Sequence, residues 1–412
     1  MPSITDHPSA RRAIPAVPVL SLATFRPAGK APPSLLDAPA LRHVTSGRIA
    51  IGMALRALGV GPGDTVLVPA YHSPSMVPPV HWRGARAVFY RVHPDTTADL
   101  DDIAAKLDPT VKAVMATHFF GIPQDLAPLR ALCDRHGIGL VEDCAHCLFG
   151  TRGPVAVGSS GDYAIGSSMK FFPVYDGGCL VSHRHPLDVR LQGGGAGFEA
   201  KAALNTLEAA FAHGRLPVLR AALALPLRLK EALWNRVKAR RGARADGTPA
   251  DGAPAPSTLA PASSDSGFDF DPRWMDRRAS LFARLVLRFA ARARIVALRR
   301  RHYLQLEQAL AGLPGCRPLF PALPDGACPW VFPVLFDDPE PVFAALQRAR
   351  VPVVRFGAVL WPGVDASVCP NSANLGRRLI AFPCHQELSA AERTWLCAAI
   401  GDAARAGAAV AA

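Results

Sequence analysis

The stretch that decides the fold is HGIGLVEDCAHCLFGTRGPVAVGSSGDYAIGSSMKFFPVYDGGCLVS, residues 136–182. It opens with a short apolar run over residues 138–141, which predicts a buried strand and ends in the acids Glu142 and Asp143. It closes with Lys170, a pair of glycines and a second apolar run over residues 179–181. The stretch therefore places a carboxylate at the C-terminal end of one strand and a lysine beside another.

A carboxylate and a lysine in this arrangement suit pyridoxal 5′-phosphate (PLP). The lysine amine forms a Schiff base with that cofactor, and an acid partners its pyridine nitrogen. Most single Asp–Lys pairs are solvated surface charges. The interpretation therefore depends on whether the rest of the chain supplies an α/β scaffold and a phosphate cradle.

The scaffold follows from the alternation of apolar runs. Strands are predicted over residues 65–69, 87–90, 111–117 and 138–141, separated by helical patterns that include residues 97–107 and 126–136. This alternation predicts βαβ units around a mostly parallel sheet. Ligands bind at the C-terminal ends of such strands. The residues found there are Tyr71, His72, His118, Asp143 and His146.

A phosphate cradle is predicted where the first helix begins. Thr45 or Ser46 can cap a helix that ends near Gly59. Ser46, Gly47 and Arg48 would then offer free backbone N–H groups and the positive end of the helix dipole to an anion. A plain helix cap explains the same residues, so both interpretations stay open.

Composition narrows the class of protein. The chain has 412 residues, is 50% hydrophobic and carries a formal net charge of +13, which favours anionic partners. No basic stripe interleaved with aromatics is present, so we expect no nucleic-acid partner. Nine scattered cysteines suit a reducing cytoplasm. Cys144 and Cys147 form a C-x-x-C without a second ligand pair, and we predict no metal site.

Four regions are predicted along the chain. Residues 1–40 form an irregular arm on the domain or on a partner subunit, and residues 41–240 form a large cofactor-binding domain with a basic helical end. Residues 241–266 form a disordered or mobile Pro/Ala/Gly-rich loop. Residues 267–412 form a long helix over about 271–311 and a smaller α+β domain. Its strands are predicted over 330–336, 351–356 and 379–384, and its helices over 341–350 and 389–404.

No stretch reaches the ~20 apolar residues of a membrane span, and prolines interrupt the N-terminus where a signal peptide would lie. The basic segment LKEALWNRVKARRGAR, residues 229–244, is expected to be a solvated or substrate-facing helix rather than a membrane contact.

These segments, taken in order, resemble the DegT/DnrJ/EryC1/StrS family, the sugar aminotransferases of PLP fold type I. The resemblance covers residues 41–183 well and 271–400 loosely, through SGRIAIGMALRALGVGPGDTVLVPAY, THFFGIPQDL, HGIGLVEDCAHCLFG, VGSSGDYAIGSSMK, DGGCLVS and LIAFPCHQELSAAE. It implies a large domain with a seven-stranded type of sheet, mostly parallel and flanked by helices, and a smaller α+β C-terminal domain.

The resemblance also implies roles for single residues. Lys170 matches the Schiff-base lysine, Asp143 the partner of the pyridine nitrogen, and His146 a residue near the cofactor's phenolic oxygen. Lys170 follows Asp162 by eight residues, about two fewer than is usual in the family.

The phosphate would be held at positions matching Ser46, Gly47, Arg48 and Ser167, although Arg48 replaces a threonine of the family. The loop after Pro69 reads AYHSPSM, so Tyr71 or His72 is the candidate that stacks on the cofactor ring.

The implied function is transfer of an amino group from a donor, by resemblance L-glutamate, to a keto sugar carried as a nucleotide diphosphate. Such sugars are used in the biosynthesis of surface polysaccharides or secondary metabolites. The family also implies a homodimer, and the cysteine usage predicts a cytoplasmic location. Two alternatives stay open. One is another fold type I PLP enzyme that acts on amino acids, and the other is a non-catalytic binding or regulatory protein with the same fold.

Overall fold

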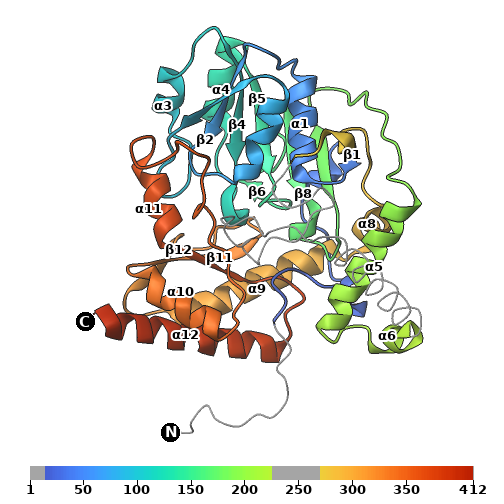
Figure 1. The fold of residues 1–412 in the computed structure, drawn as a ribbon, viewed down its shortest axis with the longest axis vertical. Coiled ribbons are helices and arrows are strands. Elements are labelled where there is room, and N and C mark those ends of the chain that lie inside the picture. The colour runs from blue at the N-terminus through green and yellow to red at the C-terminus, as the bar shows by residue number, and fades with distance from the viewer. Residues whose placement is uncertain (1–13, 225–269, 412) are drawn as a thin grey trace, which may run out of the picture.

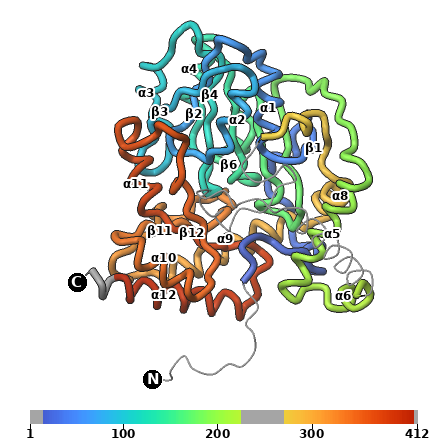
Figure 2. The backbone as a smooth tube through the Cα atoms, viewed as in Figure 1, coloured from blue at the N-terminus to red at the C-terminus, as the bar shows by residue number. Residues whose placement is uncertain are grey.

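The computed structural model describes residues 14–224 and 270–411. The predicted mobile loop over residues 241–266, and most of the basic segment before it, lie outside the described residues. Figures 1 and 2 show the large sheet, coloured blue to green, above the orange and red strands and helices of the C-terminal half, while a dark blue N-terminal segment lies beside the latter.

A seven-stranded sheet forms the larger part, in the order β1-β9-β8-β5-β4-β2-β3. Its strands are β1 (Ala40–Val44), β2 (Thr65–Pro69), β3 (Arg86–Tyr90), β4 (Val111–Thr117), β5 (Gly139–Cys144), β8 (Tyr163–Ser167) and β9 (Gly178–Ser182). Only β9 runs against its neighbours, because it pairs antiparallel with both β1 and β8 while the remaining pairs are parallel. The predicted mostly parallel sheet is confirmed.

Both faces of this sheet are covered, as expected for nearly continuous apolar strands. The helices around it are α1 (Gly47–Ala57), α2 (Pro78–Trp82), α3 (Leu100–Ala105) and α4 (Ala127–His136). Alternate residues of one strand face opposite sides, so Val66 and Val68 pack with α1, whereas Leu67 packs with the buried residues of α3 and α4. Gly137, with φ of 65°, ends α4 in the left-handed conformation that favours glycine.

A smaller antiparallel sheet in the order β10-β11-β12 forms the C-terminal part. Its strands are β10 (Cys316–Pro318), β11 (Val331–Phe336) and β12 (Leu379–Pro383), accompanied by α9 (Arg292–Leu310), α10 (Pro339–Arg348), α11 (Pro370–Arg378) and α12 (Ala390–Ala411). In Figure 1, α9 and α12 run beneath the sheets, and α12 packs against both α9 and α10.

Two predictions for the C-terminal half are wrong. The helix predicted over about 271–311 is interrupted, with α8 (Leu281–Phe289) separated from α9 at Ala290, whose ψ of 141° is extended. Ala291 N–H donates to Thr24 O at 2.9 Å, so a tertiary contact replaces the helical one there. The strand predicted over 351–356 is absent and only Val354 bridges Ala381, since Pro352 has no N–H to donate.

The remaining elements connect these parts. They are the short hairpin strands β6 (Thr151–Arg152) and β7 (Val155–Ala156), the helices α5 (Ala196–Ala212) and α6 (Pro217–Ala222), and the 3-10 turns η1 (Leu22–Phe25), η2 (Leu35–Asp37), η3 (Pro74–Met76), η4 (Phe119–Gly121), η5 (Ser168–Lys170) and η6 (Pro272–Trp274). Residues 14–39, described as irregular in the prediction, contact their own chain, since His385 Nε2 bonds Pro15 O at 2.9 Å. No helix within residues 14–224 and 270–411 is long and apolar enough to cross a membrane.

Candidate active site

Asp143 stands near the end of β5, on the face of the sheet that also carries Thr117. Its carboxylate accepts hydrogen bonds from Thr117 Oγ1 at 3.2 Å and from Ala145 N–H at 2.9 Å. Burial raises the pKa of Asp143, against the opposing effects of the Ala145 N–H, Lys170 and Thr117. A buried carboxylate with a raised pKa is set to gain from a cationic partner.

Lys170 ends the η5 turn that follows β8, the neighbour of β5 in the sheet. The residue is partly buried, and its Nζ lies 4.7 Å from the centroid of the Trp330 ring. Burial lowers the pKa of Lys170 to about 8, Asp143 opposes the decrease and Arg48 adds to it. At neutral pH roughly a tenth of the lysine is therefore an unprotonated amine, the form that attacks a carbonyl.

His146 and Trp330 are two aromatic side chains near Lys170. Their rings stack with centroids 4.0 Å apart, and His146 also stacks on Phe120 at 6.0 Å. Burial, followed by the charge of Lys170, holds the pKa of His146 well below its ordinary value, so the imidazole is neutral. The sequence prediction did not include Trp330 or Phe120.

Trp330 reaches the site because two chain segments approach closely. Trp330 N–H donates to Phe120 O at 2.8 Å. Gly121, with φ of 92°, permits this approach, since a Cβ there would lie 2.1 Å from Cys328 O. The smaller C-terminal part thus contributes a side chain to a site whose other residues come from the large sheet and from the helix and turns beside it.

The beginning of α1 faces the same region. Ser46 caps the helix by accepting a hydrogen bond from Ile49 N–H at 3.4 Å. A Cβ on Gly47 would lie 3.7 Å from Cβ of Ser167, and a Cβ on Gly178 would lie 2.4 Å from the Ser46 carbonyl carbon. Gly178 therefore lets β9 approach the start of α1, and this brings Ser46, Gly47 and Ser167 together.

Tyr71 and His72, the candidates for ring stacking, are both fully buried and fully bonded to protein. Tyr71 Oη donates to Phe356 O at 2.9 Å, and its ring packs on Phe119 at 5.3 Å. His72 bonds Ala70 O at 3.0 Å, accepts from Trp361 N–H at 3.1 Å and stacks on Phe89 at 4.9 Å. None of these contacts of His72 involves Lys170 or Asp143. Ring stacking by either residue remains a prediction.

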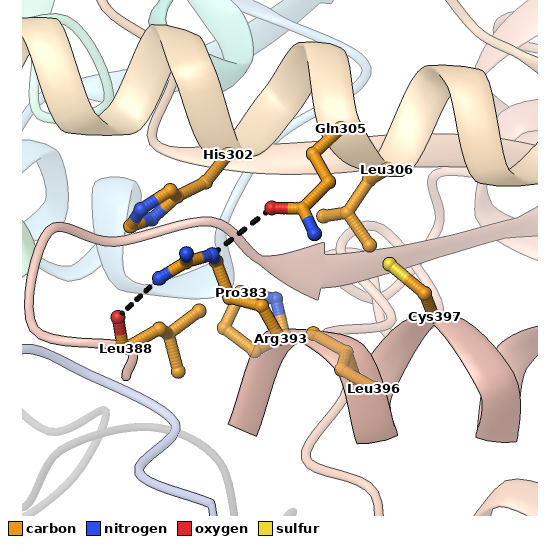
Figure 3. A pocket seen from close by; sticks show the side chains of 8 residues that line it. All are labelled: His302, Gln305, Leu306, Pro383, Leu388, Arg393, Leu396 and Cys397. Atoms are coloured by element: carbon orange, nitrogen blue, oxygen red, sulfur yellow. Dashed lines mark hydrogen bonds between the residues drawn. The ribbon is translucent and has the colours of Figure 1, made fainter. Parts of the chain in front are cut away.

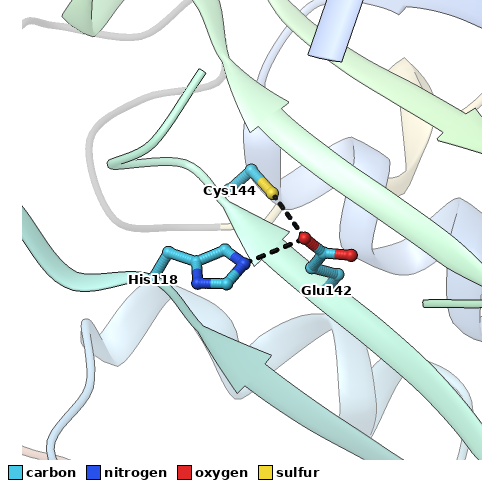
Figure 4. A group of neighbouring side chains, drawn as sticks. All are labelled: His118, Glu142 and Cys144. Atoms are coloured by element: carbon cyan, nitrogen blue, oxygen red, sulfur yellow. Dashed lines mark hydrogen bonds and ion pairs between the residues drawn. The ribbon is translucent and has the colours of Figure 1, made fainter. Parts of the chain in front are cut away.

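His118, Glu142 and Cys144 form a buried group whose potential ligand atoms lie within 4.8 Å of one another (Figure 4). Protein groups already occupy these atoms. His118 Nδ1 accepts from Gln124 N–H at 3.1 Å, so its Nε2 carries the proton that bonds Glu142 at 2.9 Å. The dashed lines of Figure 4 converge on one oxygen of Glu142. Hydrogen bonding accounts for this group without a metal ion.

The hollow in Figure 3 lies elsewhere, between α9, the end of β12 and α12. Arg393 crosses it and donates to Gln305 Oε1 and Leu388 O, both at 2.9 Å. None of its lining residues belongs to the predicted site.

The residues around Lys170 fit PLP. Among the described residues, His146 Nδ1, Ser168 Oγ and Thr45 Oγ1 are buried atoms without a hydrogen-bond partner. Ser168 N–H donates to Gly177 O, and Gly177 N–H donates to Thr45 O, so both hydroxyl residues adjoin the glycine pair before β9. Buried polar atoms without partners mark a place where a polar ligand can bind.

The architecture is that of fold type I PLP aminotransferases. Solved structures with this fold include the aminotransferase TlmJ from Streptoalloteichus hindustanus, with a TM-score of 0.59, 22% identity and coverage of 89% of this chain and 86% of that chain. They also include a putative sugar aminotransferase from Streptococcus pneumoniae in its PMP form, with a TM-score of 0.62, 16% identity and coverage of 91% and 88%.

Residues 38–193 match the model of the DegT/DnrJ/EryC1/StrS aminotransferase family. The resemblance predicted from the sequence is thereby confirmed. The UDP-N-acetyl-3-dehydro-alpha-D-glucosamine 3-aminotransferase of Acidithiobacillus ferrooxidans is 36% identical over 155 residues, covering 36% of this chain and 41% of that protein.

GDP-perosamine synthase of Vibrio cholerae is 34% identical over 143 residues, covering 34% of this chain and 39% of that protein. The matched region of this chain thus spans about two fifths of the length of these curated relatives.

Proposed function

We propose that this protein is a PLP-dependent aminotransferase that moves an amino group from L-glutamate to a keto sugar carried by a nucleotide diphosphate. The observation that carries the proposal is the pairing of Asp143 with Lys170. Asp143 lies in β5 and Lys170 follows the neighbouring strand β8, and the charge of Asp143 acts on the pKa of Lys170. An acid and a lysine at one end of a parallel sheet are the groups that PLP chemistry requires.

PLP, when bound, supplies an electron sink for the bond broken at the donor's α-carbon. Asp143 would hold a proton on the pyridine nitrogen, and this positive charge would satisfy its own buried carboxylate. Lys170 would hold the cofactor and, once free, would carry a proton to and from the substrate carbon with its Nζ. An amine whose pKa is about 8 can both accept and return that proton near neutral pH.

The other residues would hold the cofactor in place. Ser46, Gly47 and Ser167 would bind the phosphate at the N-terminus of α1, where Arg48 adds a buried positive charge. His146, with an unbonded Nδ1, would donate or accept a hydrogen bond at the edge of the ring.

The substrate class is supported by the names of the curated relatives. The relatives from Saccharopolyspora spinosa and Streptomyces venezuelae are, by name, aminating enzymes of dTDP-linked sugars, and the Acidithiobacillus relative acts on a UDP-linked sugar. A chain with a net charge of +13 suits a substrate that carries a diphosphate. We propose synthesis of surface polysaccharide or of a secondary metabolite as the purpose.

We also propose a cytoplasmic homodimer. The cysteines are all free, and a reducing compartment keeps them so. An apolar stripe on α8 supports dimer formation, because Leu281, Leu285 and Phe289 recur at every fourth position and are 52%, 45% and 61% exposed. A homodimer should be detected by light scattering, and Leu285→Asp should shift it toward monomer.

The proposed activity is tested by the absorbance spectrum of purified protein supplied with PLP, before and after addition of L-glutamate. We expect a visible band from the lysine-bound cofactor, lost in Lys170→Ala and bleached by glutamate in the wild type. Lys201→Ala is the matched control, because Lys201 also lies over an aromatic ring, 5.7 Å from Tyr175, but outside the site.

The outcomes separate the alternatives. A wild type without a visible band would contradict the enzyme and favour a binding protein with this fold. A band that glutamate does not bleach would contradict the proposed donor and favour another PLP reaction on amino acids.

A further inference from the structure

Arg299 is the largest fully buried side chain among the described residues, and it lies on α9 with 0% of its surface exposed. No ion pair among these residues includes it. Its guanidinium donates only to neutral oxygens: Gln386 Oε1 at 2.9 Å, Pro329 O at 3.1 Å, Trp330 O at 2.9 Å and Lys170 O at 2.8 Å. The guanidinium carbon also lies 4.6 Å from the centroid of the Phe171 ring.

Burying a charge in this way is costly. Burial lowers the pKa of Arg299, although a guanidinium stays charged in proteins. Apolar residues of similar volume often replace a buried charge without loss of stability. The hydrogen-bond acceptors of Arg299 therefore suggest a reason for its presence other than stability.

Two of those acceptors belong to the residues whose side chains meet in the candidate site. The Lys170 and Trp330 carbonyls come from segments 160 positions apart in the numbering, and Lys170 Nζ lies 4.7 Å from the Trp330 ring. A guanidinium presents its donors in a fixed plane, so it sets the separation of the two backbones it bonds. Gln386, which accepts from Arg299 Nε, donates to Phe171 O at 2.8 Å and fixes the residue after the lysine.

We propose that Arg299 is a positioning residue that holds the Lys170 segment against the Trp330 segment, so that the lysine amine stays over the indole ring and out of water. This proposal rests on the proposed function only in taking Lys170 as the reactive lysine. Arg299 does not touch the amine itself. It acts through the two carbonyls.

A looser Lys170 segment would admit water to the amine. The groups that act on the amine from other elements are Asp143 on β5, Arg48 on α1 and the neutral His146 after β5. Substitution of Arg299 leaves all three in place. The substitution is therefore expected to raise the pKa of Lys170 toward its ordinary value through hydration of the amine, and loss of the Arg299 charge acts in the same direction.

The test uses the full-length protein without cofactor. Acetic anhydride at limiting concentration labels amines according to their unprotonated fraction, and mass spectrometry reports the extent of labelling at Lys170 across pH. In Arg299→Gln we expect the pKa of Lys170, read from the pH midpoint of its labelling, to rise by about one unit or more.

Arg300→Gln is the matched control. Arg300 lies beside Arg299 on α9 and also donates to two backbone carbonyls, Pro324 O and Ala327 O, both at 2.8 Å, but it does not bond Lys170. Its substitution should leave the pH midpoint of Lys170 labelling within about 0.3 units of wild type. A general loosening of the C-terminal part would affect both variants alike.

If Arg299→Gln fails to fold, Gln386→Ala provides the measurement, because it keeps the guanidinium and removes only its Nε acceptor and the bond to Phe171 O. It should shift the pKa of Lys170 in the same direction by a smaller amount. A folded Arg299→Gln or Gln386→Ala with the wild-type labelling profile would overturn the proposal. Labelling needs no PLP, so a failure here is distinct from an absent visible band.

Discussion

The C-terminal end of β5 presents two adjacent carboxylates, Glu142 and Asp143, to opposite faces of the sheet, and the surroundings of the two side chains differ. Glu142 accepts backbone N–H groups of Gly158, Ser160 and Gly161 at 2.5, 2.9 and 3.0 Å, in addition to His118. Burial acts to raise the pKa of Glu142, but the bonds from His118 and the backbone outweigh it and hold the pKa below its ordinary value.

Asp143 has fewer donors, and burial raises its pKa. The two neighbouring acids thus differ in how many hydrogen bonds the protein donates to them. The protein satisfies Glu142 itself and uses it to fix the 158–161 loop. It leaves Asp143 under-satisfied, so that a ligand can complete its surroundings. We therefore expect substitution of Asp143 to affect mainly transamination, and substitution of Glu142 to affect mainly the free energy of unfolding.

The largest effect is expected from Asp143→Asn. An amide cannot hold a proton on the pyridine nitrogen, so we expect transamination with PLP and L-glutamate to slow by about 10³-fold. The unfolding free energy of the cofactor-free protein should stay equal or increase, since a raised folded pKa means that ionised Asp143 costs stability at neutral pH. Stopped-flow absorbance and urea unfolding measure the two quantities. A variant destabilised as strongly as its Glu142 counterpart would contradict the comparison.

Glu142→Gln should show the reverse pattern. The amide has one acceptor oxygen instead of two, so part of the 158–161 backbone loses its partner. We expect the unfolding free energy to fall by about 2–4 kcal/mol, measured by urea unfolding. Any loss of transamination should follow the loss of folded protein. Asp143→Asn serves as the control on the same strand.

Trp330→Leu tests the aromatic contact of Lys170. Removing the ring beneath Lys170 Nζ deletes a cation–π contact worth about 1–2 kcal/mol in a partly buried site, so transamination should slow about tenfold. Trp330→Phe keeps an aromatic face and should stay within about threefold of wild type. Single-turnover rates with L-glutamate measure both variants. Equal rates in the Leu and Phe variants would show that the ring face plays no part.

The smallest effect is expected from pH. A carboxylate whose folded pKa is depressed stabilises the protein above its unfolded pKa, 4.5 for Glu142, and this stabilisation is lost as pH falls through the folded value. The stability difference between wild type and Glu142→Gln should therefore shrink below about pH 4.5 and be constant above it. Urea midpoints between pH 3 and 7 give the profile. A difference that is independent of pH would contradict the assignment.

The sequence predicted the parts of this site that depend on local pattern. Apolar runs that end in polar residues located β2, β4 and β5, and parallel pairing then placed Thr117 and Asp143 at one edge. The pair of acids at 142 and 143 could be separated only by the family resemblance, because the N–H groups that satisfy Glu142 come from a loop whose position no local pattern specifies.

The rest of the site depends on long-range contacts. Arg299 is the first of three consecutive arginines, and composition does not distinguish them. Their spacing does carry a signal, since Ile295, Tyr303 and Leu306 place Arg299 on the buried face of the helix. For Trp330, the sequence offered only its aromatic character as an indication that it belongs to the candidate site. The break at Ala290 arises from a bond to Thr24, which no helical pattern in the sequence reveals.

The Arg299 and Gln386 contacts have a consequence for how the protein is made. They join Lys170 and Phe171 to residues 129 and 215 positions further along the chain. During synthesis the parallel strands up to β8 can pair early, whereas the segment that carries the lysine acquires its last hydrogen bonds only after residue 386 has left the ribosome. A nascent chain that ends before residue 386 thus lacks the hydrogen bond from Gln386 to the segment that carries the lysine.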